Sequence, residues 1–231
     1  MTLSSVTGGM DLDTRARQSL GSSSNAIYRM VARGLATHGV SGDNQGRLID
    51  VGCGGGGLWR EVQSRFAHYC GLDAVRYDGF PADGEFRQVD LDSDRWPDVP
   101  AGDVVAAVET IEHLENPWGF MRRLSGLAKA GALVVVTTPN QLSVLSLITL
   151  ATKRRFSAFQ DSHYPAHRTA LLESDLCRAA GEAGLDVVAI AYSLRGRLPL
   201  ARWHYPAVVA RLAPRALSDN VMIVARKIPP S

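Results

Sequence analysis

Residues Arg47–Gly57 read RLIDVGCGGGG, a short apolar run followed at once by glycines. The run is typical of a buried strand, and the glycines let the backbone turn tightly and approach a ligand closely. Leu58, Val62 and Phe66 then recur at helical spacing. We therefore predict a strand, a glycine loop and a helix whose free N–H groups face a nucleotide-like ligand.

The spacing of the glycines alone leaves two ligand classes open. Gly52, Gly54 and Gly57 also satisfy the G-x-G-x-x-G pattern of dinucleotide-binding enzymes, so an NAD-dependent oxidoreductase is one alternative. Asp50 favours the other class, because a carboxylate at the strand end suits a cationic amine and suits a pyrophosphate poorly. The amino group of a methionine moiety is such a cation.

Two more acids follow later strands. Asp73 ends the strand expected over 68–72, where a carboxylate can accept hydrogen bonds from both ribose hydroxyls. Asp90 ends the strand expected over 85–89 and can take the exocyclic amine of adenine, while the backbone of Leu91 meets the ring. Each acid alone is readily explained as a turn cap, but the set of three predicts an adenosyl ligand.

Short apolar runs alternate with helical patterns along most of the chain, which predicts an α/β fold with a parallel sheet. The crossover over 73–84 contains Gly79, Pro81 and Gly84, so we expect a turn or two there instead of a helix. The expected helices lie over 25–37, 116–131 and 172–183, and the expected strands over 47–51, 68–72, 85–89, 103–108, 132–137, 185–192 and 221–226.

The composition fits one globular domain of 231 residues, with a net charge of only +2 that argues against nucleic-acid binding. We expect residues 1–22 to form a flexible arm without the apolar core of a signal peptide, and residues 23–231 to form the domain. No apolar run is long enough for a membrane span. Cys53, Cys70 and Cys177 form no CxxC pair, which favours a reducing, cytoplasmic location.

From Gly46 to Arg226 the sequence resembles the class I S-adenosylmethionine-dependent methyltransferase superfamily. Residues Glu109–Leu114 (ETIEHL) and Val136–Asn140 (VTTPN) resemble the segments after strands four and five of the ubiquinone-biosynthesis O-methyltransferase type. The resemblance implies S-adenosylmethionine as cofactor and a Rossmann-like, seven-stranded, mostly parallel sheet with an antiparallel last strand and helices on both faces. The cofactor-binding residues predicted on this basis are Asp50, Gly52, Cys53, Gly54, Gly56, Asp73, Ala74, Asp90, Leu91 and Glu109.

Methyl transfer to a hydroxyl is helped by a base, and histidine is the side chain whose ordinary pKa suits that task. We predict His113 as the catalytic base, the alternative being that it caps a helix or packs beside the cofactor. His163 is the second catalytic candidate. It lies with His167 in a segment, 140–170, that we expect to form the lid over the acceptor, where exposed loop residues are the plainer explanation.

A divalent metal is conceivable but not expected. Glu109, Glu112 and His113 stand at i, i+3 and i+4, so a helical turn would bring their ligand atoms to one face. Such pairs also arise as ordinary helix-surface contacts, and we predict no metal ligands.

Charge is concentrated locally. The segment 187–218 lacks acids and carries Arg195, Arg197, Arg202, Arg211 and Arg215, with Trp203 and Tyr205 among them, and Lys153–Arg155 forms a second basic run. These patches favour an anionic or lipid-linked acceptor or transient contact with a membrane surface, against the alternative of a solvated helical face.

The favoured function is methylation of a small molecule, with oxygen as the expected acceptor atom. A non-catalytic S-adenosylmethionine-binding module is the remaining alternative, since it would keep the acids and need neither histidine.

Overall fold

The computed structural model describes residues 21–229 except residues 41, 43–44, 200 and 202. Residues 1–20 of the expected arm, and Arg202 of the basic segment, therefore lie outside the described residues.

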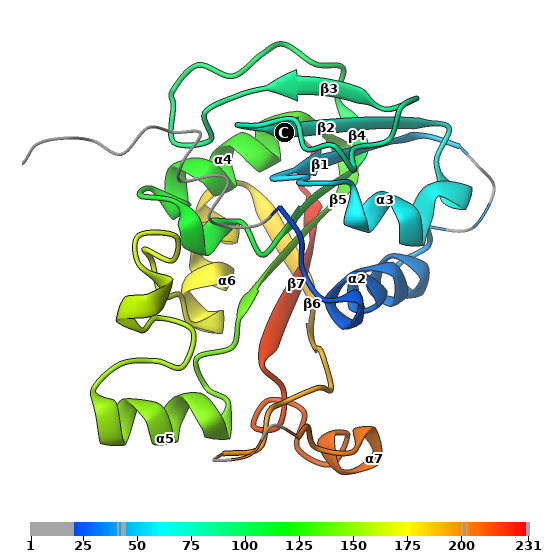
Figure 1. Ribbon diagram of the computed structural model, residues 1–231. Helices are drawn as coiled ribbons and strands as arrows, with labels where there is room; N and C mark the ends of the chain where they lie inside the picture. The colour runs from blue at the N-terminus through cyan, green and yellow to red at the C-terminus, as the bar shows by residue number, and fades with distance from the viewer. Residues whose placement is uncertain (1–20, 41, 43–44, 200, 202, 230–231) are drawn as a thin grey trace, which may run out of the picture.

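A seven-stranded sheet forms the centre of the described chain, in the order β3-β2-β1-β4-β5-β7-β6 (Figure 1). Strand β7 runs antiparallel to both of its neighbours, and the other neighbouring pairs are parallel. The expected α/β sheet with an antiparallel last strand is confirmed. The strands are β1 (Arg47–Val51), β2 (His68–Asp73), β3 (Glu85–Gln88), β4 (Gly102–Val108), β5 (Ala128–Pro139), β6 (Leu185–Tyr192) and β7 (Asn220–Lys227).

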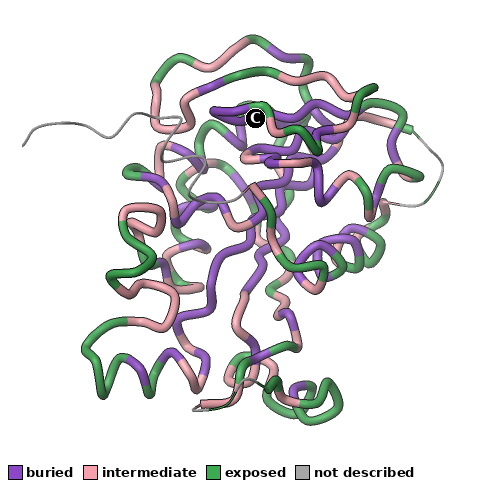
Figure 2. Tube along the Cα trace, viewed as in Figure 1, coloured by how far each residue is buried: buried purple, intermediate pink, exposed green. Residues whose placement is uncertain are grey.

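Helices cover both faces of this sheet because its central strands are apolar on both sides. Leu48 of β1 points to the face covered by α2 (Asn25–Thr37) and α3 (Gly57–Val62), where it joins the buried Leu35 and Leu58. Ile49, the next residue, points to the opposite face, covered by α4 (Pro117–Leu127) and α6 (Glu173–Glu182). Figure 2 shows the buried positions gathered along these strands.

The expected ends of two helices, and the expected bounds of the strand over 132–137, which is β5 (Ala128–Pro139), were wrong. The helix expected over 116–131 ends at Leu127, because Ala128 already pairs with Gly102 and begins β5. Helix α3 ends at Val62 and is followed by the 3-10 turn Gln63–Arg65, so Phe66 is buried from extended backbone and not from the helix.

The shortened crossover between β2 and β3 is confirmed, since this stretch contains turns and no helix. The expected lid segment contains a helix of its own, α5 (Val144–Lys153), and a 3-10 turn at Asp161–His163. The segment before β7 contains the short α7 (Ala207–Ala210). Among the described helices, none combines the length and apolar character needed to cross a bilayer.

Candidate active site

A cavity of about 390 Å³ lies where β1, β2 and β4 end. The predicted site residues that line it are Asp50, Gly52, Cys53, Asp73, Ala74, Asp90, Leu91, Glu109 and His113. Of the other predictions, Gly54, Gly56 and His163 are not among the described residues of its wall. The three acids expected at the strand ends therefore face one cavity, as open α/β sheets place their ligands.

Asp50 is a buried carboxylate at the base of the cavity, with 2% of its surface exposed. Burial, together with the charge of the nearby Asp73, raises the pKa of Asp50 to about 7, against the opposing effect of a hydrogen bond donated by Tyr69. A buried anion is costly without a counter-charge. A cationic ligand beside Asp50 would supply that charge.

The glycine loop is fixed by hydrogen bonds to β2. Gly52 donates its N–H to the carbonyl of Leu72 at 2.7 Å, and Gly54 donates to Oδ2 of Asp73 at 2.8 Å. Gly52 has a φ of +72°, and a Cβ there would lie 2.3 Å from Oγ1 of Thr110. Glycine at position 52 is thus required both by the backbone conformation and by the close approach of the segment after β4.

Asp73 accepts from two backbone amides, with Ala74 donating to Oδ1 at 2.7 Å. Burial raises the pKa of Asp73, while these amides lower it. Each carboxylate oxygen has a second lone pair, so Asp73 can still accept from ligand hydroxyls. Asp90 similarly accepts from the amide of Asp92 at Oδ1, at 3.1 Å.

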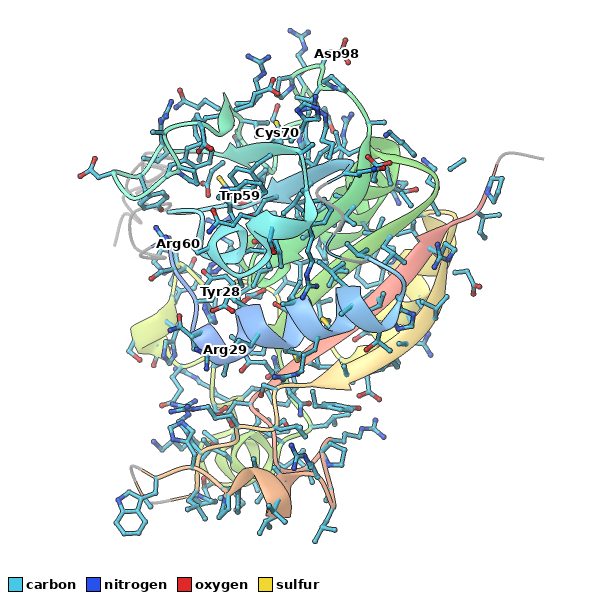
Figure 3. All side chains as sticks on the ribbon, turned by 90° about the vertical axis from the view of Figure 1, so that its right-hand side faces the viewer. Tyr28, Arg29, Trp59, Arg60, Cys70 and Asp98 are labelled. Atoms are coloured by element: carbon cyan, nitrogen blue, oxygen red, sulfur yellow. The ribbon has the colours of Figure 1, made fainter. Side chains whose placement is uncertain are left out.

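The residues just before α2 form part of the wall, which the sequence did not indicate. Gly21 accepts a hydrogen bond from the Gly55 N–H at 2.9 Å, and the cavity lining includes residues 21–24. Tyr28 lies on α2 on the side of α3 (Figure 3) and accepts from the amide of Ser23 at 2.8 Å. A Cβ at Gly54 would lie 2.0 Å from the Gly21 carbonyl, so Gly54 shapes the cavity by admitting this segment.

Gly56 acts in the turn that leads into α3. It has a φ of +74° and precedes the helix, and a Cβ there would lie 2.5 Å from the Pro81 ring. A non-glycine residue would be strained at this position.

The helical turn considered over Glu109–His113 was wrong. Glu109 has a φ of +51°, and only Ile111–His113 form a single 3-10 turn. The Glu109 carboxylate accepts from Thr137 at 2.8 Å and from Asn220 at 2.7 Å. Burial, followed by the charge of Glu112, raises the pKa of Glu109. These contacts hold Glu109 at the cavity wall, so its carboxylate does not lie on one helix face with His113.

The end of the segment 140–170, the expected lid, returns to the cavity next to His113. The backbone carbonyl of Glu112 accepts from the amides of Arg168 and Thr169 at 2.8 and 3.0 Å. Oγ1 of Thr169 donates to the Leu114 carbonyl at 2.7 Å, and Arg168 forms an ion pair with Glu115. These bonds place Pro165, Ala166 and His167 in the wall.

The two histidines of the wall face each other, with ring centroids 4.8 Å apart and planes at 84°. Nδ1 of His113 lies 2.7 Å from the Ala166 carbonyl, and Nδ1 of His167 lies 2.8 Å from the Ala158 carbonyl. A carbonyl oxygen only accepts, so each Nδ1 carries a proton, and Nε2 is the basic nitrogen of each neutral ring. Burial and the neighbouring His113 lower the pKa of His167 to about 4.

His163 is exposed and has its ring 5.7 Å from that of His167. Its Nδ1 accepts from the Gln160 amide at 3.4 Å, within the turn before Tyr164. The structure therefore places His163 behind His167 relative to the cavity lining.

Glu112, His113 and His167 offer ligand atoms that all lie within 4.8 Å of one another. Oε1 of Glu112 is buried without a hydrogen-bond partner, and burial raises the pKa of this carboxyl to about 8. Two imidazoles and a carboxylate are donors that suit divalent transition metals. His167 takes the place that the sequence interpretation gave to Glu109.

The sheet order, the glycine loop and the acids at successive strand ends define a class I S-adenosylmethionine-dependent methyltransferase. A family model described as a methyltransferase domain matches residues 25–190, and the chain belongs to that family. The resemblance inferred from the sequence is confirmed, together with S-adenosylmethionine as the cofactor.

The individual relatives and solved structures that resemble this chain include further methyltransferases, at low sequence identity. The ubiquinone biosynthesis O-methyltransferase of Aeromonas salmonicida is 25% identical over 150 residues, which cover 61% of this chain and 63% of that enzyme. A putative methyltransferase from Bacillus halodurans has a TM-score of 0.61 at 13% identity, over 86% of this chain and 99% of that one. Magnesium protoporphyrin IX methyltransferase from Synechocystis, solved with bound S-adenosylhomocysteine, has a TM-score of 0.55 at 15% identity, over 95% and 89%. Both of these solved structures share the fold of this chain.

Proposed function

We propose that this protein transfers a methyl group from S-adenosylmethionine to an oxygen atom of a small-molecule acceptor. The observation that carries the proposal is His113, which lines the cofactor cavity and donates Nδ1–H to the Ala166 carbonyl. This contact leaves Nε2 as the basic nitrogen of the neutral ring, which suits removal of a hydroxyl proton. The similarity to ubiquinone biosynthesis O-methyltransferases supports oxygen as the acceptor atom.

The residues of the cavity fit the cofactor. Asp50 would pair with the amino group, Asp73 with the ribose hydroxyls, and Asp90 with the adenine amine beside the Leu91 backbone. Cys53, Ala74 and Glu109 complete the wall around these groups. The cofactor supplies an activated methyl on a sulfonium, so the protein has mainly to orient the acceptor and exclude water.

His113 is the proposed base. As the acceptor oxygen forms its bond to the methyl carbon and the carbon–sulfur bond breaks, Nε2 takes the hydroxyl proton, leaving a methyl ether and S-adenosylhomocysteine. His167 is proposed as the second histidine of the site in preference to His163, because it lines the cavity and His163 does not. Its low pKa keeps His167 neutral, so it orients the acceptor or His113 instead of holding a proton.

The test has two parts. Titration calorimetry with S-adenosylhomocysteine and NAD should show binding of the first only, and binding of NAD alone would contradict the cofactor assignment. Incubation with S-adenosylmethionine and a panel of catechols, phenols, amines and thiols, followed by mass spectrometry, should show a gain of one methyl on oxygen. Cofactor binding without transfer to any acceptor would favour a non-catalytic module, and methyl on nitrogen or sulfur would refute O-methylation.

A further inference from the structure

Two further cavities lie in series beside the cofactor cavity. The first, here called the middle cavity, has a volume of about 530 Å³ and shares Ser24 and Ile27 with the cofactor cavity. The second, here called the basic cavity, has a volume of about 490 Å³ and shares Ser193, Arg195 and His204 with the middle cavity. The shared lining residues place the three cavities next to one another, from the cofactor cavity to the region between α2 and α7.

The basic cavity collects arginines from distant parts of the chain. Arg29 and Arg33 come from α2, Arg195 from the segment after β6, and Arg211 from the end of α7. Figures 1 and 3 both show α2 lying next to the segment that carries α7, and Figure 3 labels Arg29 on α2. His204 lines the same cavity. The fold thus adds Arg29 and Arg33 of α2 to the basic segment that the sequence shows around Arg195 and Arg211.

Most of this positive charge is not neutralised within the described chain. Arg29 forms an ion pair with Glu61 at 3.7 Å. The side chains of Arg33, Arg195 and Arg211 have no hydrogen-bond or ion-pair partner among the described residues. Like charges held together without counter-ions raise the local positive potential and attract anions.

One acid faces this region and is already paired. Asp219 is the only acidic residue among the described lining of the middle and basic cavities. Its Oδ2 accepts from Nε of Arg197 at 2.9 Å. Asp219 therefore neutralises Arg197 and leaves the arginines of the basic cavity uncompensated.

A buried hydroxyl adds a polar atom to the same place. Ser193 lines both cavities and is 5% exposed, and its Oγ has no hydrogen-bond partner. Buried polar atoms are nearly always paired in folded proteins, so the Ser193 hydroxyl can bond a polar group that enters the cavity beside these arginines.

We propose that the basic cavity binds an anionic group of the methyl acceptor, a phosphate or carboxylate held by Arg33, Arg195 and Arg211. Guanidinium groups bind such oxyanions through paired, charge-assisted hydrogen bonds. The acceptor extends through the middle cavity and presents its reactive hydroxyl at the cofactor cavity. This inference rests on the proposed function, because it assigns one end of the acceptor that His113 would deprotonate.

Pyrophosphate is the probe for the anion site. Titration calorimetry at low salt, with saturating S-adenosylhomocysteine, should show pyrophosphate binding to the wild-type protein. Arg33→Gln and Arg195→Gln should each weaken binding about tenfold, because each removes a charge-assisted contact. Arg122→Gln on α4 is the matched control: it removes the same charge from an exposed position on the opposite face of the sheet and should leave the affinity unchanged.

The affinity for S-adenosylhomocysteine, measured in the same variants, separates the two proposals. Normal cofactor affinity with lost pyrophosphate binding supports the anion site and shows that the variants are folded. If the wild-type protein did not bind S-adenosylhomocysteine at all, the proposed function would instead be refuted.

Co-sedimentation with lipid vesicles identifies whether the anionic group belongs to a lipid or to a soluble acceptor. Arg195-dependent sedimentation with phosphatidylglycerol vesicles, and none with phosphatidylcholine, would assign the anion to a lipid headgroup, whereas pyrophosphate binding alone assigns it to a soluble acceptor. Binding of neither probe, or equal weakening by Arg122→Gln, overturns the inference.

Discussion

Tyr69 on β2 donates a hydrogen bond of 3.1 Å to Oδ2 of Asp50 on the neighbouring β1, and both side chains are buried. Tyr69 in turn stacks on Trp59, with ring centroids 4.6 Å apart, so its hydroxyl is held in place. The hydrogen bond favours the charged form of Asp50, while burial favours the neutral form. The carboxyl group that we propose to pair with the cofactor amine is therefore close to its titration midpoint at neutral pH.

We expect cofactor affinity to depend on pH through Asp50. Its pKa is raised to about 7, so below that pH the carboxyl is neutral and cannot pair with the amino group. Affinity for S-adenosylhomocysteine should fall as pH drops from 8.5 to 5.5, by up to about tenfold per unit below the midpoint. Titration calorimetry across this range measures it.

Two variants check that Asp50 is responsible. Asp50→Asn should bind weakly at every pH, and Tyr69→Phe should move the midpoint upward because it removes the hydrogen bond that lowers the pKa. An unchanged pH dependence in Asp50→Asn would contradict the assignment.

Asp50 should also destabilise the ligand-free protein at high pH. In the folded protein the pKa of Asp50 is about 7, above the ordinary value of 3.8 that applies to the unfolded chain. The stability that this difference contributes is therefore fully present below pH 4, and it is lost as the pH rises through 7 and the buried carboxyl becomes charged. The loss is on the order of 4 kcal/mol at pH 8, from about 1.4 kcal/mol per pKa unit. Thermal unfolding without ligand should find Asp50→Asn more stable than wild type at pH 8 and similar to it at pH 4. Equal stabilities at pH 8 would refute the raised pKa.

Gly54→Ala should impair cofactor binding by displacing the segment before α2. The added Cβ would lie 2.0 Å from the Gly21 carbonyl, and the position has a φ of +50°. We expect a loss of about 1–3 kcal/mol in stability and at least about tenfold in affinity for S-adenosylhomocysteine.

Gly126→Ala is the matched control for that change. Gly126 is exposed in α4 and has no atom within 4 Å of an added Cβ, so alanine should stabilise the helix by up to about 1 kcal/mol and leave affinity unchanged. Normal binding by Gly54→Ala would show that the segment at Gly21 does not shape the cofactor site.

Replacing His113 should slow methyl transfer without weakening cofactor binding. His113→Asn is expected to lower kcat by about 10²–10⁴-fold, because a positioned base is lost. His163→Asn, a control at an exposed histidine of the segment 140–170, should change kcat by less than about twofold. The result that would contradict the assignment is a full rate in His113→Asn, or equal losses in both variants.

The central sheet could be predicted from the sequence because its signals are local. Each buried strand appears as an apolar run, and the glycines and acids stand directly at strand ends. Asp50, Asp73 and Asp90 meet in the cavity because parallel strands carry their carboxyl ends to one edge. His113 follows β4 closely and was found by the same argument.

The features that were missed depend on contacts between distant segments. The end of α4 is set by the pairing of Ala128 with Gly102, which no local pattern reveals. The conformation of Glu109 is held by Thr137 and Asn220 on other strands. Residues 21–24 reach the cavity because Gly21 bonds to Gly55.

The segment 140–170, the expected lid, is held by hydrogen bonds at both of its ends. Asn140 donates to the carbonyls of Arg215 and Ser218 at 2.6 and 2.8 Å, and Arg168 and Thr169 are bound to the Glu112 carbonyl. Residues 141–157 can therefore change in length or composition while His113 and His167 keep their contacts with the carbonyls of Ala166 and Ala158. If the segment contacts the acceptor as expected, we expect the preference for acceptors to change through these residues and not through those of the cofactor cavity.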